Sequence, residues 1–205
     1  MAILMMALIV EIGHTAVMLP MAGAIAAWLL AGRAWQRALC WCLMFAAGLS
    51  MVALSKIAFL GWETGIPSLH FDALSGHAFR AAAVIPVFFF VVLQGTPTSW
   101  RAGGVACGIA LGVGIAVLLV RFGFHTASEV IASSVLGCVV GLGFMRIAAG
   151  LPAPRISRST VLFSVIIFAA IFALKPSSIS HRLVDIALYL SQRDHPFVWS
   201  KIRDR

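Results

Sequence analysis

This sequence is poor in charged residues. Only 11% of its 205 residues are Asp, Glu, Lys or Arg, whereas a soluble domain carries roughly 25%. Hydrophobic residues make up 61% of the chain, and its mean hydropathy is +1.03. Because so little polar surface cannot cover a water-soluble globule, the composition excludes soluble classes and indicates an integral membrane protein.

The alternation of apolar and polar residues that is typical of transmembrane strands is absent too. The apolar runs are continuous, and lipid tolerates no unpaired backbone groups, so we expect helices. Six runs reach or approach the ~20 residues that a spanning helix needs. The sequence therefore predicts an all-α polytopic membrane protein, a six-transmembrane-helix bundle. The predicted spans are 15–32, 38–58, 77–94, 102–120, 127–148 and 159–174.

Paired cysteines in a loop are also lacking. All four cysteines lie inside predicted spans, and we expect them to be small core residues. They are Cys40, Cys42, Cys107 and Cys138. The net charge of +8 does not indicate nucleic acid, because Lys and Arg stand mostly at the ends of apolar runs or in the tail. Such positions indicate membrane orientation and contact with lipid headgroups.

The chain divides into a membrane domain, 1–174, and a polar tail, 175–205. Apolar residues recur at helical spacing around 183–190, which predicts an amphipathic surface helix in the tail. Residues 1–14 are expected to lie at the interface or to extend the first span, in preference to a cleaved signal peptide. Glycines four apart, at 104, 108 and 112, predict close helix packing, and the fifth span repeats the device.

Three connections between predicted spans carry arginines and no acids, which places them in the cytoplasm by the positive-inside rule. The basic tail would then lie outside, which argues against this orientation. Two polar islands face away from the cytoplasm in this arrangement: Phe71–Arg80, with Ser-Gly-His at 75–77, and Arg121–Glu129, with His125. We expect the two islands to meet and form one phosphate-handling site.

The residue types in the islands fit that chemistry. On a helix, Glu129 would lie beside His125. A carboxylate on one ring nitrogen makes the other a better base or nucleophile. Lys56 and Arg121 end two predicted spans on this face, and Arg80 lies one turn beyond the Ser-Gly-His. Cations and backbone N–H groups at helix starts bind anions.

Each of these residues also has a purely structural interpretation. His77 would be a helix-start residue, and His125 with Glu129 a buried structural pair. Lys56 and Arg121 would extend to the headgroups. Arg80 would support packing or the surface.

Together the residues resemble the signature of the type 2 phosphatidic acid phosphatase family. Its usual pattern is Lys-x6-Arg-Pro, then Pro-Ser-Gly-His, then Ser-Arg-x5-His-x3-Asp. Lys56, the Ser-Gly-His at 75–77, and His125 with Glu129 match it, and the resemblance covers residues 56–137. The departures indicate a divergent branch. Glu63-Thr64 replaces Arg-Pro, Leu74 replaces proline, Leu119 stands at the usual arginine position, and Glu129 replaces aspartate.

The resemblance implies a lipid phosphatase that uses neither metal nor cofactor. His125 would form a phosphohistidine, Glu129 would orient it, and His77 would protonate the leaving oxygen. Lys56 and Arg121 would stabilise the phosphoryl oxygens. Ser75 and the Gly76 N–H would share that role, and Arg80, Arg121 or Arg182 would replace the missing arginine. The substrate would be phosphatidate, phosphatidylglycerophosphate, a polyprenyl diphosphate or the phosphate of lipid A. The enzyme would lie in a bacterial inner membrane with its active site on the periplasmic face.

Three other functions remain open at this stage. One is a catalytically inactive, lipid-binding relative. Another is a carrier of haem or an ion with His77 and His125 as ligands. The third is an intramembrane serine protease with Ser75 as nucleophile and His125 as base.

Overall fold

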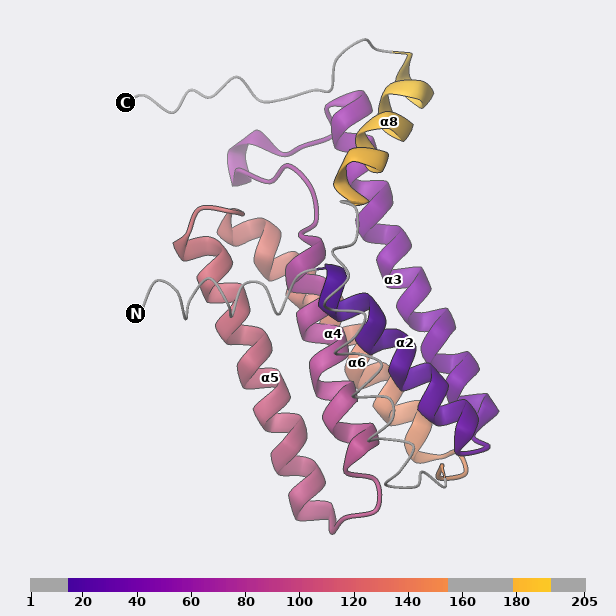
Figure 1. The fold of residues 1–205 in the computed structure, drawn as a ribbon. Helices are drawn as coiled ribbons and strands as arrows, with labels where there is room; N and C mark the ends of the chain where they lie inside the picture. Colours follow the sequence, from indigo (N-terminus) through magenta and orange to yellow (C-terminus); the bar gives the residue numbers. More distant parts are fainter. Residues whose placement is uncertain (1–14, 155–178, 193–205) are drawn as a thin grey trace.

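The computed structural model describes residues 15–154 and 179–192, and these ranges are helical throughout apart from short connections (Figure 1). The helices are α2 (Thr15–Ala31), α3 (Trp35–Trp62), the 3-10 turn η1 (Pro67–Leu69), α4 (Gly76–Val92), α5 (Thr98–Arg121), α6 (Ala127–Ala149) and α8 (Ile179–Ser191). No strand forms in these ranges, and the backbones of Ile66 and Phe71 make an isolated antiparallel bridge. The expectation of an all-helical chain is confirmed for the described residues.

Three helices are long and apolar enough to cross a membrane: α3, α5 and α6. The apolar helices α2 and α4 are shorter. Five predicted spans coincide with α2 to α6, whereas the sixth, 159–174, lies outside the described residues, as do residues 1–14. The chain is therefore an all-helical membrane protein, and the count of six spans stays a prediction.

Helix α4 lies at the centre of the bundle and is buried along most of its length, with α5 and α6 packed against it. Glycines permit the close approach. A Cβ added at Gly108 of α5 would lie 2.8 Å from Pro86 Cα, and one added at Gly137 of α6 would lie 2.5 Å from the Phe79 carbonyl oxygen. The predicted small-residue packing is confirmed for the glycines that face α4, which are Gly104, Gly108 and Gly112 of α5 and Gly137 and Gly141 of α6.

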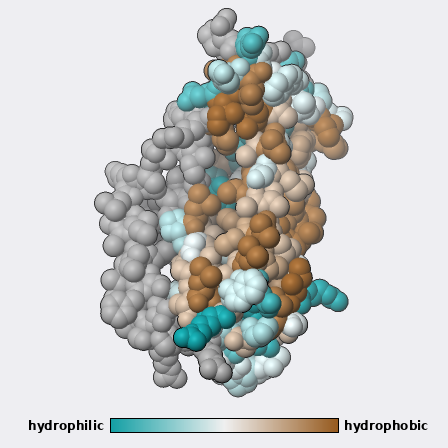
Figure 2. Space-filling view, turned by 90° about the vertical axis from the view of Figure 1, so that its right-hand side faces the viewer, coloured by the Kyte–Doolittle hydropathy of each residue, from teal (hydrophilic) through white to brown (hydrophobic). Residues whose placement is uncertain are grey.

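The cysteine prediction was wrong for two of the four residues. Cys42 and Cys107 are exposed, and Cys40 and Cys138 are half-buried. In a membrane protein the outer surface is itself apolar, so a small apolar residue inside a span need not face the core. Figure 2 shows this pattern on one face, where hydrophobic side chains cover the middle and hydrophilic ones gather mainly near the two ends.

The two ends of the bundle differ. We call the "histidine end" the one where α3 and α5 finish and α4 and α6 begin, and the "arginine end" the opposite one, at the α2–α3 turn. Helix α8, the helix expected in the tail, packs against α3 at the histidine end, where Ser191 Cβ would lie 3.1 Å from a Cβ at Gly61 (Figure 1).

Candidate functional site

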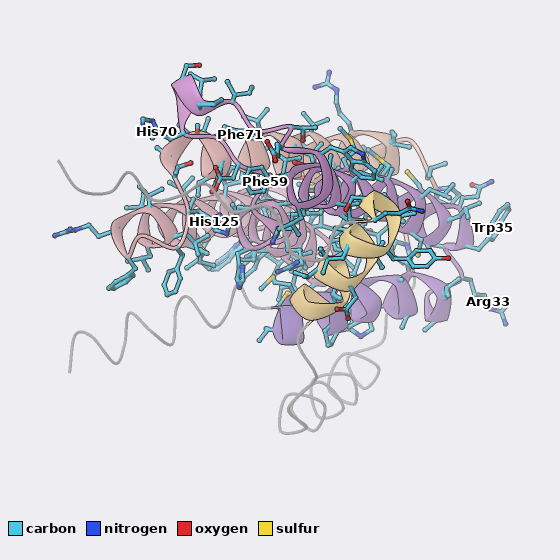
Figure 3. All side chains as sticks on the ribbon, turned by 90° about the horizontal axis from the view of Figure 1, so that it is seen from above. Arg33, Trp35, Phe59, His70, Phe71 and His125 are labelled. Atoms are coloured by element: carbon cyan, nitrogen blue, oxygen red, sulfur yellow. The ribbon has the colours of Figure 1, made fainter. Side chains whose placement is uncertain are left out.

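The two polar islands meet at the histidine end. The Asp72 N–H donates to Glu129 Oε1 over 3.1 Å, and the Ser75 N–H donates to Ser133 Oγ over 2.7 Å. The Leu74 N–H donates to Ser55 Oγ of α3 over 3.1 Å. These bonds fix the start of α4 against the first turns of α6 and the last turns of α3. Figure 3 shows His70, Phe71 and His125 on one side of the bundle at this end.

His125 and Glu129 form the pair that their spacing predicts. His125 Nδ1 lies 2.7 Å from Glu129 Oε2, and the carboxylate is buried whereas the imidazole is 21% exposed. An ionised carboxylate only accepts hydrogen bonds, so it holds the ring hydrogen on Nδ1. In a neutral imidazole the Nε2 atom of His125 then carries the lone pair, which is the form that a nucleophile or base requires.

Glu129 is at the same time part of a capping box at the start of α6. The Thr126 N–H donates to Glu129 Oε2 over 3.2 Å, and the Glu129 N–H donates to Thr126 Oγ1 over 3.4 Å. The capping box satisfies backbone N–H groups that have no partner within the helix. Our sequence reasoning missed this role, although the Thr-x-x-Glu pattern at 126–129 is its known signal.

Ser75 caps α4 rather than lining a cavity. Its backbone is extended, its Oγ accepts from the Ala78 N–H over 3.4 Å, and the residue is fully buried. The hydroxyl therefore organises the first turn of α4. The expected contact of Ser75 with a phosphate, and its alternative role as a nucleophile, stay predictions.

Arg80 places a buried cation at the start of the same helix. A Cβ added at Gly76 would lie 2.9 Å from Arg80 Nη1, so the guanidinium folds back over the glycine and needs the space that its missing side chain leaves. Arg80 is only 7% exposed, and its Nε has no hydrogen-bond partner among the described residues. A buried polar group in that condition is costly, and the Nη1 atom of the same guanidinium is the one that lies close to Gly76.

Lys56 belongs to the same cluster. It is half-buried on α3, next to Ser55, and both Arg80 and Glu129 act on it electrostatically. His77 is the second residue of α4 and is half-buried. The sequence thus anticipated a group of cations beside the histidine–carboxylate pair.

Arg121 lies apart from this group. It is the exposed last residue of α5, and among the described residues no hydrogen bond or ion pair joins it to the other candidates. It lines the edge of an apolar groove of about 850 Å³ between α5 and α6, together with Ala127, Val130 and Ile131. The side chain of Arg182 lies outside the described part of the chain. Arg80, not Arg121, is therefore the arginine close to the start of α4.

Over the residues that the structure describes, no three His, Cys, Asp or Glu side chains gather in a way that could hold a metal ion. The candidate groups that the structure brings to this end are the His125–Glu129 pair, the half-buried His77 at the start of α4, the buried Arg80 and the half-buried Lys56.

Helices and site together define an all-helical membrane protein with a polar cluster at one end of its bundle. The chain is 31% identical over 148 residues to the "Uncharacterized 22.5 kDa protein in cps region" of Klebsiella pneumoniae, a match that covers 70% of this chain and 69% of that protein. The chain belongs to the family of that protein. No protein-family model matches it, and no solved structure matches it.

Proposed function

We propose that this membrane protein is a lipid phosphatase that works through a phosphohistidine at His125. The observation that carries the proposal is the 2.7 Å contact between His125 Nδ1 and the buried Glu129 carboxylate, next to the start of α4. This contact orients the partly exposed imidazole of His125, and the cations of the same cluster are the buried Arg80 and the half-buried Lys56. The resemblance to the type 2 phosphatidic acid phosphatase signature supports the same assignment.

In the proposed reaction, Nε2 of His125 attacks the phosphorus atom and the bond from phosphorus to the lipid oxygen breaks. His77 gives a proton to that leaving oxygen. Water then attacks the phosphohistidine, which releases inorganic phosphate and restores the free imidazole. Phosphoryl transfer depends mainly on positioning and charge stabilisation. Arg80, Lys56 and the Gly76 N–H would supply the stabilisation.

An apolar substrate fits the surroundings of this cluster. The groove between α5 and α6 is lined by aliphatic side chains along most of its length, and Arg121 stands at its edge near the histidine end. A lipid whose phosphate enters the cluster would have an apolar surface available for its chain. Phosphatidate, phosphatidylglycerophosphate, polyprenyl diphosphates and lipid A phosphates all satisfy this requirement.

The charge distribution supports the orientation that we propose. The arginine end carries Arg33, Arg37, Arg101 and Arg146, whereas the described acids lie at the histidine end. In a six-helix bundle of a bacterial inner membrane, the positive-inside rule would put the arginine end in the cytoplasm. The histidine cluster would then face the periplasm.

The test is release of inorganic phosphate from a panel of these lipids by the purified protein in detergent with EDTA. His125→Ala is compared with His70→Asn. His70 is an exposed loop residue with φ of 49°, a conformation that asparagine tolerates. We expect EDTA-resistant release that vanishes in His125→Ala and persists in His70→Asn. Acid-labile phosphate on the wild-type protein after rapid quenching would identify the intermediate.

The same samples distinguish the other functions. No phosphate release from any lipid, with lipid still bound, would favour an inactive relative. A Soret absorption band that His77→Ala and His125→Ala abolish would favour a haem carrier. Covalent labelling of Ser75 by a serine-directed phosphonate would favour a protease.

A further inference from the structure

A polar cavity lies at the arginine end, at the opposite end of the bundle from the histidine cluster. It has a volume of about 210 Å³, and residues Arg33 to Arg37 and Pro152 line it. Two of these residues are arginines, and no acid is among them. The described acids, Glu63, Asp72, Glu129 and Asp185, lie on elements of the histidine end. The cavity is therefore a positively charged site without a described counter-ion.

The start of α3, from Ala34 to Arg37, lines this cavity. The N-cap residue is Ala34, which has no side chain to accept from the first turn, and no acid lies in that turn. The first N–H groups of an α-helix have no partner within the helix, and the dipole places positive charge there. Trp35 and Gln36, at this start, both line the cavity. An anion there would satisfy groups that the protein itself does not cap.

Arg37 adds a buried cation to the uncapped helix start. It is only 4% exposed, it lines the cavity, and its Nε has no hydrogen-bond partner among the described residues. Its Nη1 donates to Gln94 Oε1 over 2.9 Å, and its Nη2 donates to the Leu151 carbonyl oxygen. Arg101 acts on it as a further positive charge. Arg101 itself lines a separate cavity, with its guanidinium 5.7 Å from the centre of the Phe90 ring, so the cations that line the charged cavity are Arg33 and Arg37.

Arg33 occupies a backbone position that normally suits glycine. The Arg33 N–H donates to the Leu30 carbonyl and the Ala34 N–H donates to the Leu29 carbonyl, which is the Schellman pattern that ends α2. Arg33 has φ of 58°, in the left-handed region. An arginine there costs about 1–2 kcal/mol more than glycine would. Glu63, His70 and Gln192 are left-handed as well, so the backbone conformation alone assigns no use to Arg33; its place in the lining of the cavity does.

An apolar groove continues from the cavity along α3. The groove has a volume of about 370 Å³ and shares Trp35 and Gln36 with the charged cavity, and its other lining residues include Leu39 and Leu43. Trp35, Leu39 and Leu43 are four residues apart and are 62%, 51% and 62% exposed. They form one outward stripe, and Figure 3 shows Arg33 and Trp35 reaching outward at the edge of the bundle. Tryptophan favours the headgroup level of a bilayer.

We propose that the cavity at the start of α3 binds the phosphate of an anionic phospholipid, with one acyl chain along Leu39 and Leu43. The charged cavity adjoins the apolar groove at Trp35 and Gln36, so a headgroup in the cavity would have its acyl chain in the groove. Basic pockets beside membrane helices bind such headgroups. This lipid is a bound component of the arginine end and is not a substrate, so the inference does not depend on the proposed phosphatase activity.

The test counts bound lipids by native mass spectrometry on the full chain in detergent. Phosphatidylglycerol is compared with phosphatidylcholine of the same acyl chains, with thermal unfolding as a second measurement. Arg33→Asn is the main variant, because asparagine tolerates the left-handed backbone, so the turn is retained. We expect wild type to retain phosphatidylglycerol and to be stabilised by it, and Arg33→Asn to bind it about fivefold more weakly.

Arg146→Gln is the matched control, because Arg146 is an exposed arginine in the last turn of α6 at the same end. It should bind phosphatidylglycerol as wild type does, and Arg33→Lys should restore most of the affinity lost in Arg33→Asn. Equal binding of the two lipids by wild type would overturn the proposal. So would an equal loss in Arg146→Gln, or stabilisation by inorganic phosphate alone as large as that by phosphatidylglycerol.

Discussion

Replacing Gly137 by alanine is expected to force α4 and α6 apart and to weaken the fold and the candidate site together. The new Cβ would lie 2.5 Å from the Phe79 carbonyl oxygen and 2.8 Å from Ala82 Cβ. The first of these atoms belongs to the backbone of buried helix α4, so no flexible side chain can move away to relieve the contact. The two helices themselves must separate.

The size of the effect follows from two opposing contributions. Overpacking a close contact costs about 1–3 kcal/mol, and a clash with backbone belongs near the upper limit. Alanine has a higher helix propensity than glycine, which offsets this cost by up to about 1 kcal/mol. The net loss is about 2 kcal/mol, which lowers the melting temperature of a chain of this size by roughly 4–8 °C.

Gly114→Ala is the matched control, because no atom lies within 4 Å of the Cβ that it would add to α5. Thermal unfolding of both variants in one detergent should show a lower melting temperature for Gly137→Ala and an unchanged or higher one for Gly114→Ala. Ser133, one turn before Gly137, would move with the helix, so phosphate release should fall as well. Equal melting temperatures for the two variants would refute the packing argument.

Three further substitutions probe the site, with phosphate release and thermal unfolding as measurements. Glu129→Gln should lower phosphate release by up to about 10⁴-fold, because an amide beside Nδ1 no longer fixes the productive tautomer of His125; unchanged release would exclude that role. Arg80→Met should lower release while the melting temperature stays or rises, since it replaces a buried cation whose Nε is unpaired among the described residues; a large loss of stability would identify a structural residue instead. Ser133→Ala should cost about 1–3 kcal/mol, because it leaves the buried Ser75 N–H unpaired, whereas Ser134→Ala at the groove should cost little.

The helices could be predicted closely because lipid allows few alternatives to a helix. The first predicted span, 15–32, differs from α2 by one residue at its end. The second, 38–58, was too short, since α3 continues from Trp35 to Trp62. A hydropathy pattern detects only the apolar part of a spanning helix. Helix α3 extends beyond that part at both ends, to Trp35 and Trp62. The ends of such a helix are set by turns such as the left-handed Glu63.

The histidine–carboxylate pair could be predicted because it is local. Residues four apart on a helix are neighbours whatever surrounds them, and His125 stands close enough to the start of α6 for this rule to hold. The bonds from the Asp72 and Ser75 N–H groups to α6 could not be predicted individually. They depend on how α4 and α6 dock, which side-chain spacing along one segment does not determine.

The place of Arg121 could have been predicted from helix geometry. Gly112 faces α4, and each residue advances about 100° around a helix, so Arg121, nine residues later, points to the opposite side of α5. Leu119, seven residues later, faces α4 again and is 1% exposed. The position that holds an arginine in the phosphatidic acid phosphatase signature is thus a buried leucine in this chain. The phosphatase that we propose would need a cation from another helix, and Arg80 of α4 is the one that lies beside Gly76.

Glu129 explains why the site and the fold are difficult to separate at this end. Its carboxylate accepts from the Thr126 N–H, the Asp72 N–H and His125 Nδ1. The first bond begins α6, the second holds the loop before α4, and the third orients the imidazole. A buried carboxylate is costly unless its oxygens are satisfied, and here the bonds that satisfy it also set the position of His125. In the phosphatase that we propose, a glutamate at this capping position would serve in place of the aspartate of the phosphatidic acid phosphatase signature, because the helix start directs its carboxylate back to His125.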